Sequence, residues 1–383
     1  MNNRVLVLLI ALLFFACQAE KKSELLVIDV ETAIENPVEI LCSDFIGSFE
    51  YIPLETRDSC LIDGNPAVQI LDNNLLVRTP NDCFLFDAQT GKFKTRIGKR
   101  GRGPGEYRQT IDLIDFDNST VFFAGQNGDL LEYSLQNKFI KSIKIPTYND
   151  GFENPSIPIA YTSYKNWIVC HFGNLTGTEK KFLMGINKST GNADFIIPNK
   201  RIFEYNGLKI SAKEVAFYRF NNEFYIKEDY NDTIYCMQDS LLIPHVVLSA
   251  GRFQLTHEMY WDKNVEETEF VTPGDVFETN NFLTFQYFYR KKPYFGLYSK
   301  KHQNVVVTEI ENGLKNDIDN FVNFKPFMGI TNHVLVGIAD AYVVTEWFLK
   351  NSEKIDQLPP ELQKLKNIKE TDNPVVMIAK LKE

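Results

Sequence analysis

The residues best suited to bind a charged ligand lie in one glycine-rich segment, residues 98–107, with the sequence GKRGRGPGEY. Arg100 and Arg102 could hold a carboxylate or a phosphate through paired hydrogen bonds. Glycines let backbone amides approach such a ligand closely, and Glu106 and Tyr107 end the segment. We therefore take Arg100, Arg102, Glu106 and Tyr107 as candidate ligand-binding residues.

A purely structural role accounts for the same segment. In that interpretation the glycines satisfy tight turns, Glu106 pairs with an arginine, and Tyr107 packs between structural repeats. A phosphate-binding loop of the Walker type is excluded, because no Gly-Lys-Ser/Thr motif follows and no helix begins there. The binding and the structural interpretations both stay open at this point.

Catalytic chemistry has no recognisable signature in the sequence. There is no GxSxG motif for a nucleophilic serine, and we predict no catalytic residue and no cofactor. The histidines show neither HxH nor HxxxH spacing; they are His171, His245, His257, His302 and His333. A divalent metal site assembled from distant residues stays an alternative. The carboxylates that could contribute to such a site are Asp115, Asp117, Asp232 and Asp340. The alternative for each is a turn residue whose side chain hydrogen-bonds its own backbone.

The N-terminus has the pattern of an export signal. Arg4 forms a short basic region, and residues 5–15 are an unbroken apolar run. That run is far shorter than the roughly 20 residues of a membrane-spanning helix, so it predicts a secretory signal and not an anchor. Ala16 then leads directly into Cys17.

A small residue before Cys17, followed by the polar residues 18–22, resembles a bacterial lipoprotein signal. The resemblance implies that residues 1–16 are removed, that the thiol of Cys17 is acylated, and that residues 17–24 form a tether. The lipid would anchor a water-soluble folded part to the membrane, and Gln18 after the cysteine implies the outer membrane. Whether the protein faces the periplasm or the cell surface stays open. An ordinary signal peptide with an incidental cysteine is the alternative.

Five further cysteines would meet an oxidising compartment after export: Cys42, Cys60, Cys83, Cys170 and Cys236. An odd number cannot all pair within the chain, and the sequence has no CxxC motif to support a zinc or thioredoxin-like site. Cys42 and Cys60 are a candidate disulfide pair. The other three stand beside aromatic or β-branched residues, and we expect them to be small buried residues on strands.

Composition favours a β-rich protein and excludes one class of partner. The 383 residues are 44% hydrophobic and 13% aromatic, which allows a large core and favours strands over helices. The formal net charge is -9, and the basic residues form no stripe. Nucleic acid is therefore excluded as a partner.

A strand–turn–strand pattern recurs along the chain at intervals of about 50 residues. Residues 84–93 (FLFDAQTGKF) match residues 131–139 (LEYSLQNKF) after one deletion, and residues 182–191 repeat the pattern. Weaker copies occupy residues 223–248 and 282–309. Repeats of this length, each with about four short strands, are typical of propeller blades. These five copies, with residues 321–342 and strands at the termini as material for a sixth, predict an all-β, six-bladed β-propeller that spans residues 25–383 as a single domain.

The ends of the chain should close the ring. Residues 375–381 are suited to pair with N-terminal strands, such as residues 25–30 and 49–54, in the last blade, because this pairing removes an exposed sheet edge. Two regions interrupt the repeats. Residues 251–281 predict a loop or short helix that projects from one rim, and residues 339–365 predict two short helices inserted in the last blade.

Several segments together resemble a known family. They are the leader, residues 98–107, and the segments NDTIY (231–235), NDID (316–319) and DNPVVMI (372–378). They resemble the six-bladed β-propeller lipoproteins of Bacteroidetes, relatives of NHL-type propellers and largely of unknown function. The resemblance implies the fold and a location in the cell envelope. It implies no established chemistry.

We expect a non-enzymatic binding or scaffold protein, anchored by lipid, whose partner is a glycan, a peptide or an outer-membrane protein. One alternative is a metal-dependent envelope hydrolase or lyase, similar to lactonases, with its metal at the mouth of the central channel. Another is a structural subunit of an outer-membrane complex. Fold alone does not decide between these functions, because function depends on the site.

Overall fold

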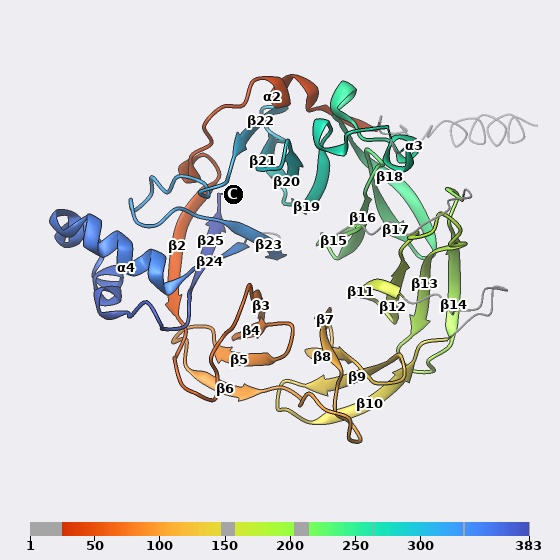
Figure 1. The fold of residues 1–383 in the computed structure, drawn as a ribbon, viewed down its shortest axis with the longest axis horizontal. Helices are drawn as coiled ribbons and strands as arrows, with labels where there is room; N and C mark the ends of the chain where they lie inside the picture. The colour runs from red at the N-terminus through yellow and green to blue at the C-terminus, as the bar shows by residue number, and fades with distance from the viewer. Residues whose placement is uncertain (1–24, 147–157, 203–213, 263, 332–333, 383) are drawn as a thin grey trace, which may run out of the picture.

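The structure, a computed structural model, describes residues 25–146, 158–202, 214–262, 264–331 and 334–382. Six sheets stand around a central axis, as Figure 1 shows, and form a six-bladed β-propeller. The predicted fold class is therefore confirmed. Cys17, the leader, the tether and His333 lie outside the described residues.

Each blade has four antiparallel strands, and the first strand of each lies nearest the axis (Figure 1). Blades 1 to 3 consist of consecutive strands: β3 (Ala67–Leu71), β4 (Asn74–Arg78), β5 (Cys83–Asp87) and β6 (Phe93–Arg96); β7 (Gln109–Asp115), β8 (Thr120–Ala124), β9 (Asp129–Ser134) and β10 (Phe139–Lys144); β11 (Pro158–Tyr164), β12 (Trp167–Phe172), β13 (Lys181–Asn187) and β14 (Ala193–Pro198). Blades 4 and 5 follow the same order: β15 (Val215–Phe220), β16 (Glu223–Glu228), β17 (Thr233–Gln238) and β18 (Leu241–Ser249); β19 (Thr272–Glu278), β20 (Phe282–Tyr289), β21 (Lys292–Ser299) and β22 (Asn304–Glu309).

Blade 6 joins the two ends of the chain. It contains β23 (Pro326–Thr331), β24 (Val334–Ala339), β25 (Val375–Leu381) and, as its outer strand, β2 (Ile46–Pro53). Tyr51 of β2 lies opposite Met377 of β25, and β25 pairs with β24 on its other side. The predicted closing strand is thus confirmed, and its central position leaves Val375, Val376 and Met377 without solvent exposure.

One N-terminal strand lies elsewhere than predicted. β1 (Leu26–Asp29) pairs in parallel with β18, the outer strand of blade 4, with Ile28 opposite Leu248. The expectation that residues 25–30 contribute to the last blade is wrong. The physical reason is local: β18 otherwise ends its sheet with an unpaired edge, and Ile28 is buried in the core between blades 4 and 5.

The hydrophobic core consists of six clusters, and each lies between two neighbouring blades. A middle strand such as β8 is therefore buried on both faces, and its sequence, TVFFA, is apolar after Thr120 instead of alternating. The same burial explains the run Phe84, Leu85 and Phe86 in β5, which packs against blade 6 on one face and blade 2 on the other.

The cysteines are free among the described residues. Cys42 lies in the cluster between blades 5 and 6, whereas Cys60 lies in the cluster between blades 6 and 1. Their thiols donate to different carbonyls, that of Cys42 to Leu314 O and that of Cys60 to Glu55 O. The candidate disulfide is thus contradicted, because the blade 6 strands separate the two residues.

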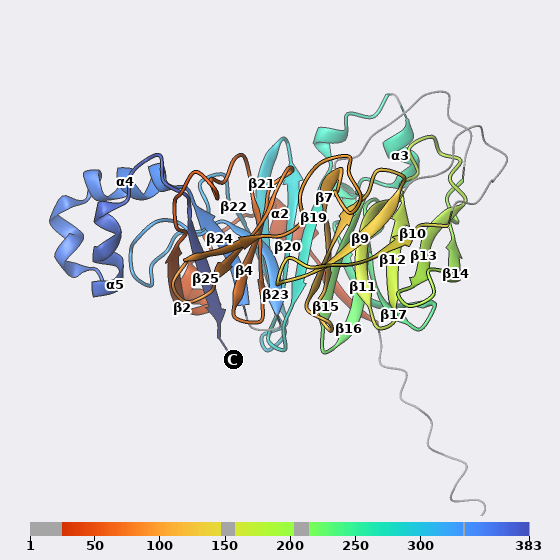
Figure 2. The ribbon, with the colours of Figure 1, turned by 90° about the horizontal axis from the view of Figure 1, so that it is seen from below.

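Short helices occupy both predicted interruptions. Between β18 and β19 lie the helix α3 (His257–Trp261) and two 3-10 helices, η2 (Gly251–Phe253) and η3 (Glu267–Glu269). Outside these interruptions, α2 (Glu31–Glu35) and the 3-10 helix η1 (Cys42–Asp44) follow β1. The insertion in blade 6 contains α4 (Ala341–Lys350), η4 (Ser352–Gln357), α5 (Pro360–Gln363) and η5 (Lys364–Asn367), and it protrudes from the rim of the ring (Figure 2). Among the described residues, no helix is long and apolar enough to cross a membrane.

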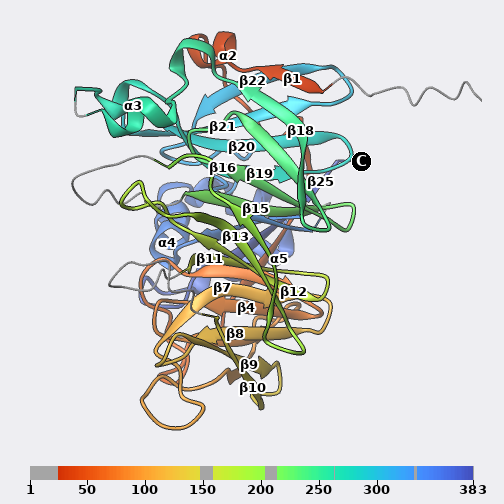
Figure 3. The ribbon, with the colours of Figure 1, turned by 90° about the vertical axis from the view of Figure 1, so that its right-hand side faces the viewer.

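The two faces of the ring carry different connections. The loops from the outer strand of one blade to the inner strand of the next share a face with the turns between second and third strands. We call it the crossover face; α3 lies on it, and the C-terminus lies on the opposite face (Figure 2). β1 starts on the side of the C-terminus and runs, parallel to β18, toward the crossover face (Figure 3).

Candidate functional site

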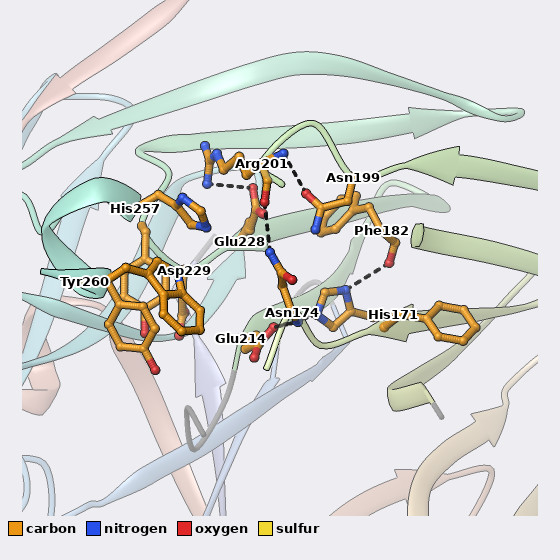
Figure 4. Close-up of a pocket in the computed structure, with 13 residues that line it drawn as sticks. His171, Asn174, Phe182, Asn199, Arg201, Glu214, Glu228, Asp229, His257 and Tyr260 are labelled. Carbon is orange, nitrogen blue, oxygen red and sulfur yellow. Dashed lines mark hydrogen bonds and ion pairs between the residues drawn. The ribbon is translucent and has the colours of Figure 1, made fainter. Parts of the chain in front are cut away.

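A pocket opens on the crossover face between blades 3 and 4, beneath α3 (Figure 4). The space inside it that is open to a water-sized group is about 30 Å³, so the pocket is narrow. Its lining comes from the β12–β13 and β16–β17 turns, the two ends of the crossover from β14 to β15, and α3: His171, Phe172, Asn174, Phe182, Asn199, Arg201, Glu214, Glu228, Asp229, Tyr230, His257, Tyr260 and Trp261.

Aromatic side chains form one wall of the pocket. The Thr256 side chain caps the start of α3 by accepting a hydrogen bond from Met259 N, which starts this short helix. Tyr260 then stacks on Tyr230 with the ring centroids 4.2 Å apart, and Trp261 packs edge-on against Tyr260 at 5.3 Å. The helix is therefore fixed to the β16–β17 turn through its rings, and these rings line the apolar side of the pocket.

Asn174 organises the polar floor. Its backbone N–H donates to Glu214 Oε2 at 3.0 Å, and its side-chain amide donates to Arg201 O at 2.9 Å. Its side-chain oxygen accepts from Glu179 N at 3.0 Å. One residue of blade 3 thus holds both ends of the crossover into blade 4, so the floor is positioned before any ligand binds.

Arg201 and Glu228 form an ion pair across the pocket. The guanidinium Nη1 lies 3.2 Å from Glu228 Oε2, and the same oxygen accepts a hydrogen bond from Asn231 Nδ2 at 3.2 Å. Asn199 Oδ1 accepts from Arg201 N at 2.9 Å and fixes the backbone. Both charged side chains are partly exposed. The ion pair therefore adds little to the stability of the fold, and it forms a polar edge of the pocket.

His171 presents a buried nitrogen to the pocket. Its side chain is 3% exposed, and Nδ1 lies 3.1 Å from Phe182 O. Because a carbonyl only accepts hydrogen bonds, Nδ1 carries the hydrogen. Nε2 lies 3.5 Å from Glu214 Oε2 and has no hydrogen-bond partner among the described residues (Figure 4).

The second histidine, His257, lies on α3. Burial lowers the pKa of His257 below its usual value of 6.5, and the positive charge of Arg201 lowers it further. His257 is therefore a neutral imidazole at pH 7. It belongs to the aromatic wall, with its ring 6.4 Å from that of Trp261.

The carboxylates considered for a metal do not converge. Asp115 is fully buried and pairs with Lys188 at 2.7 Å, and Asp117 lies 3.6 Å from Arg219. Asp232 accepts a hydrogen bond from the hydroxyl of the neighbouring Thr233, and Asp340 precedes α4 in blade 6. Within the described part of the chain, no three histidine, cysteine, aspartate or glutamate side chains are grouped to hold a metal ion.

The glycine-rich loop lies on the crossover face but at another junction, between blades 1 and 2. Tyr107 is fully buried and stacks on Phe123 at 4.4 Å, and its hydroxyl donates to Asn81 O at 2.9 Å. Glu106 pairs with Lys99 at 2.8 Å and accepts from Gly103 N. The expected partner of Glu106, an arginine, is thus a lysine.

The two arginines of this loop differ from each other. Arg100 donates to Asn81 Oδ1 at 2.7 Å and to Arg108 O at 3.1 Å, and Arg102 is exposed. Arg100, Glu106 and Tyr107 therefore hold the loop together, which agrees with the structural interpretation. Ligand binding by these residues and by Arg102 stays a prediction, and the structure does not bring any of them into the pocket beneath α3.

Sequence reasoning did not find this pocket. Its residues come from separate segments, around residues 171–182, 199–201, 228–230 and 257–261, and from Glu214, and no spacing links them. The one signal was the sequence HEMYW at residues 257–261, because a histidine with two adjacent aromatic residues is unusual in a polar insertion. The sequence predicts only a loop or short helix there.

The sequence profile of a family described as a domain of unknown function (DUF4934) matches residues 25–380. The chain belongs to the DUF4934 family. The match spans all six blades, so the family is defined by the whole propeller. No curated protein matches this DUF4934 chain.

Two solved structures resemble this DUF4934 protein to different degrees. A protein of Bacteroides fragilis NCTC 9343, described as exported, is 16% identical, with a TM-score of 0.70 over 94% of this chain and 100% of that chain. The PQQ-bound aldose sugar dehydrogenase of Streptomyces coelicolor is 11% identical, with a TM-score of 0.40 over 88% of this chain and 99% of that chain. The first likeness supports the propeller fold and nothing more. The relationship to NHL-type propellers and the lipid anchor stay predictions.

Proposed function

We propose that this DUF4934 protein is a lipid-anchored binding protein of the outer membrane, related to NHL-type propellers, which holds a glycan or a peptide in the pocket beneath α3 without transforming it. The observation that carries this proposal is the pairing of an aromatic wall, Tyr260 and Trp261, with a prearranged polar floor organised by Asn174. Ligands with a flat apolar face and a polar edge, such as a sugar ring or a short peptide, match this lining.

The floor is rigid, which favours binding. Asn174 uses its backbone N–H, its side-chain amide and its side-chain oxygen to hold Glu214, Arg201 and Glu179 in place. Groups that are already ordered lose little entropy when a ligand arrives. The pocket is thus suited to capture a small ligand and not to enclose a large one.

The direction of β1 supports the anchored arrangement. A tether that ends at Leu25 would leave the ring on the side away from α3, because β1 runs toward the crossover face (Figure 3). A lipid on Cys17 would therefore hold the opposite face toward the membrane. The pocket would then face away from the bilayer and stay accessible to ligands.

The anchor is tested by changing Cys17→Ser and separating membrane and soluble fractions. We expect the variant in the soluble fraction, because a single lipid-bearing thiol provides the attachment. Cys236→Ala is the matched control and should stay with the membrane. Retention of the Cys17→Ser protein in the membrane fraction would contradict the lipid anchor.

Ligand binding is tested on the soluble Cys17→Ser protein with a panel of monosaccharides, disaccharides and tripeptides in a thermal-shift screen followed by calorimetry. Trp261→Ala should weaken the best ligand by about tenfold or more, as expected for an aromatic anchor. The double variant Arg100→Ala/Arg102→Ala should bind as before. If the double variant lost binding and Trp261→Ala kept it, the binding site would be the glycine-rich loop. If no probe bound at all, the small-ligand pocket would be contradicted.

A further inference from the structure

We propose that the ligand carries a primary ammonium group, which this pocket binds between His171 Nε2 and the carboxylate of Glu214. The inference rests on the proposed function, because it specifies the ligand chemistry of the same pocket. His171 and Glu214 both line that pocket, and Figure 4 shows the imidazole and the carboxylate directed toward each other.

The position of the hydrogen on His171 follows from its hydrogen bond to Phe182. Nδ1 donates to Phe182 O at 3.1 Å, so a neutral ring leaves Nε2 as a hydrogen-bond acceptor. The ring is 3% exposed, and Nε2 has no hydrogen-bond partner among the described residues. A buried acceptor without a donor costs about 1–3 kcal/mol. A ligand that supplies the donor removes this cost.

A carboxylate lies beside His171 Nε2. Glu214 Oε2 lies 3.5 Å from Nε2, and it already accepts from Asn174 N at 3.0 Å. Two acceptors therefore face the same point of the pocket. A single hydroxyl can donate to only one of them and turns its lone pairs toward the other. The group that fits carries at least two hydrogens on one atom.

The ligand charge favoured beside Glu214 is positive. Arg201 is engaged with Glu228 at 3.2 Å, whereas the described surroundings of Glu214 offer it only the backbone N–H of Asn174 and the ring of His171. A cation is favoured beside this carboxylate, because a charge-assisted hydrogen bond is roughly twice as strong as a neutral one.

An ammonium group could belong to an amino sugar or to the free N-terminus of a peptide. The shared chemistry is the –NH3+ group, so each source is tested against its own acetylated form. On the soluble Cys17→Ser protein, calorimetry compares D-glucosamine with N-acetyl-D-glucosamine, and trialanine with N-acetyl-trialanine. We expect the amine of one pair to bind about tenfold tighter or more than its acetylated form.

Three variants locate the effect. Glu214→Gln keeps the shape and removes the charge, and it should abolish the preference for the amine. His171→Phe keeps the ring against Phe182 and removes the acceptor, and it should reduce the preference in the same direction. Glu353→Gln makes the same chemical change on the exposed blade 6 insertion and should leave the preference intact. Circular dichroism and melting temperature establish that each variant is folded.

Equal affinity for an amine and its acetylated form, or a preference that survives in a folded Glu214→Gln protein, would overturn the inference; water alone would then fill the space between the two acceptors. Binding of an uncharged sugar or acetylated peptide that is lost in Trp261→Ala would still support the proposed function. If no probe binds at all, both fall.

Discussion

Gly98 and Tyr107 form a pair in which a glycine makes room for a buried ring. Gly98 has a φ of +66°, and a Cβ at this position would lie 2.9 Å from Tyr107 Cε1. Tyr107 cannot move aside easily, because it is fully buried and stacked on Phe123. The glycine is therefore required both by the backbone and by its neighbour.

We expect Gly98→Ala to lower the free energy of unfolding by about 2–3 kcal/mol, from left-handed backbone strain and displacement of the Tyr107 ring. Gly128→Ala is the matched control, because its φ is +74° and nothing lies within 4 Å of its Cβ position. It should cost only the backbone strain, about 1 kcal/mol. Urea denaturation measures both, and equal losses would show that the Tyr107 contact is unimportant.

Glu278 is a buried carboxylate between blades 4 and 5. It is 1% exposed, pairs with Lys300 at 2.6 Å and His245 at 3.0 Å, and accepts from the Tyr218 hydroxyl at 2.9 Å. Burial raises the pKa of Glu278, but the hydrogen bond from His245 and the charge of Lys300 outweigh it, and the pKa lies below the ordinary 4.5. The network stabilises the ionised form.

A carboxyl whose pKa is lower in the folded state stabilises the protein above its unfolded pKa, and this stability is lost as the pH falls through the folded pKa. We therefore expect the free energy of unfolding to fall as the pH drops below about 4.5. Glu278→Gln should make this fall shallower and cost about 3 kcal/mol at pH 7, because Lys300 loses its partner. Glu353→Gln serves as control. An unchanged acid profile in Glu278→Gln would contradict the assignment.

At the scale of elements, β1 shows how a short terminal strand can be docked by one face. Ile28 is 2% exposed in the core between blades 4 and 5, whereas its neighbour Val27 is 58% exposed. Four parallel pairings with β18 hold this strand. Its stability should therefore depend on Ile28 and hardly on Val27.

We expect Ile28→Ala to reduce the free energy of unfolding by about 2–4 kcal/mol, because it opens a cavity between the two blades. Val27→Ala, the adjacent control, should change it by less than about 0.5 kcal/mol. Chemical denaturation of both variants checks the expectation. Similar small effects would mean that β1 contributes little to blade 4.

For the whole molecule, the cysteines matter through their burial. Cys42, Cys60, Cys83, Cys170 and Cys236 are all buried and free. Burial raises the pKa of Cys42 and of Cys83 to about 12, so neither is a thiolate at neutral pH. The propeller is thus held together by six inter-blade clusters and a closing strand, and no described cross-link contributes.

We therefore expect a reductant to leave the melting temperature unchanged. The native Cys17→Ser protein should not react with a thiol reagent, whereas the protein unfolded in guanidinium should show all five thiols of the described chain. A lower melting temperature in dithiothreitol would contradict the free thiols and point to a disulfide.

Five repeats, together with the apolar strands near the chain ends, were sufficient to predict six blades and their closure. A blade is built from strands that follow one another in the chain, so its hairpins leave a local signal, as in residues 84–93 and 131–139. The closing strand β25 was also recognisable, because it is a run near the C-terminus that is apolar except for Lys380. The place of β1 was not, because nothing in residues 25–30 distinguishes the edge of blade 4 from that of blade 6.

The candidate site was predicted less well from the sequence than the blades. Glycines and arginines in residues 98–107 are conspicuous in the sequence, yet in the fold three of the four candidate residues there bond within the loop or beneath it. The pocket beneath α3 has no comparable motif. Its histidine, carboxylate and aromatic residues come from different blades.

Local order along the chain is therefore enough to specify a propeller, because hairpin periodicity and apolar strands are properties of neighbouring residues. The pocket depends on which blades meet, on the angle at which α3 packs against Tyr230, and on the tautomer that Phe182 O imposes on His171. These are contacts between residues distant in the chain. Only the closed ring brings a buried imidazole nitrogen and a carboxylate within 3.5 Å of each other.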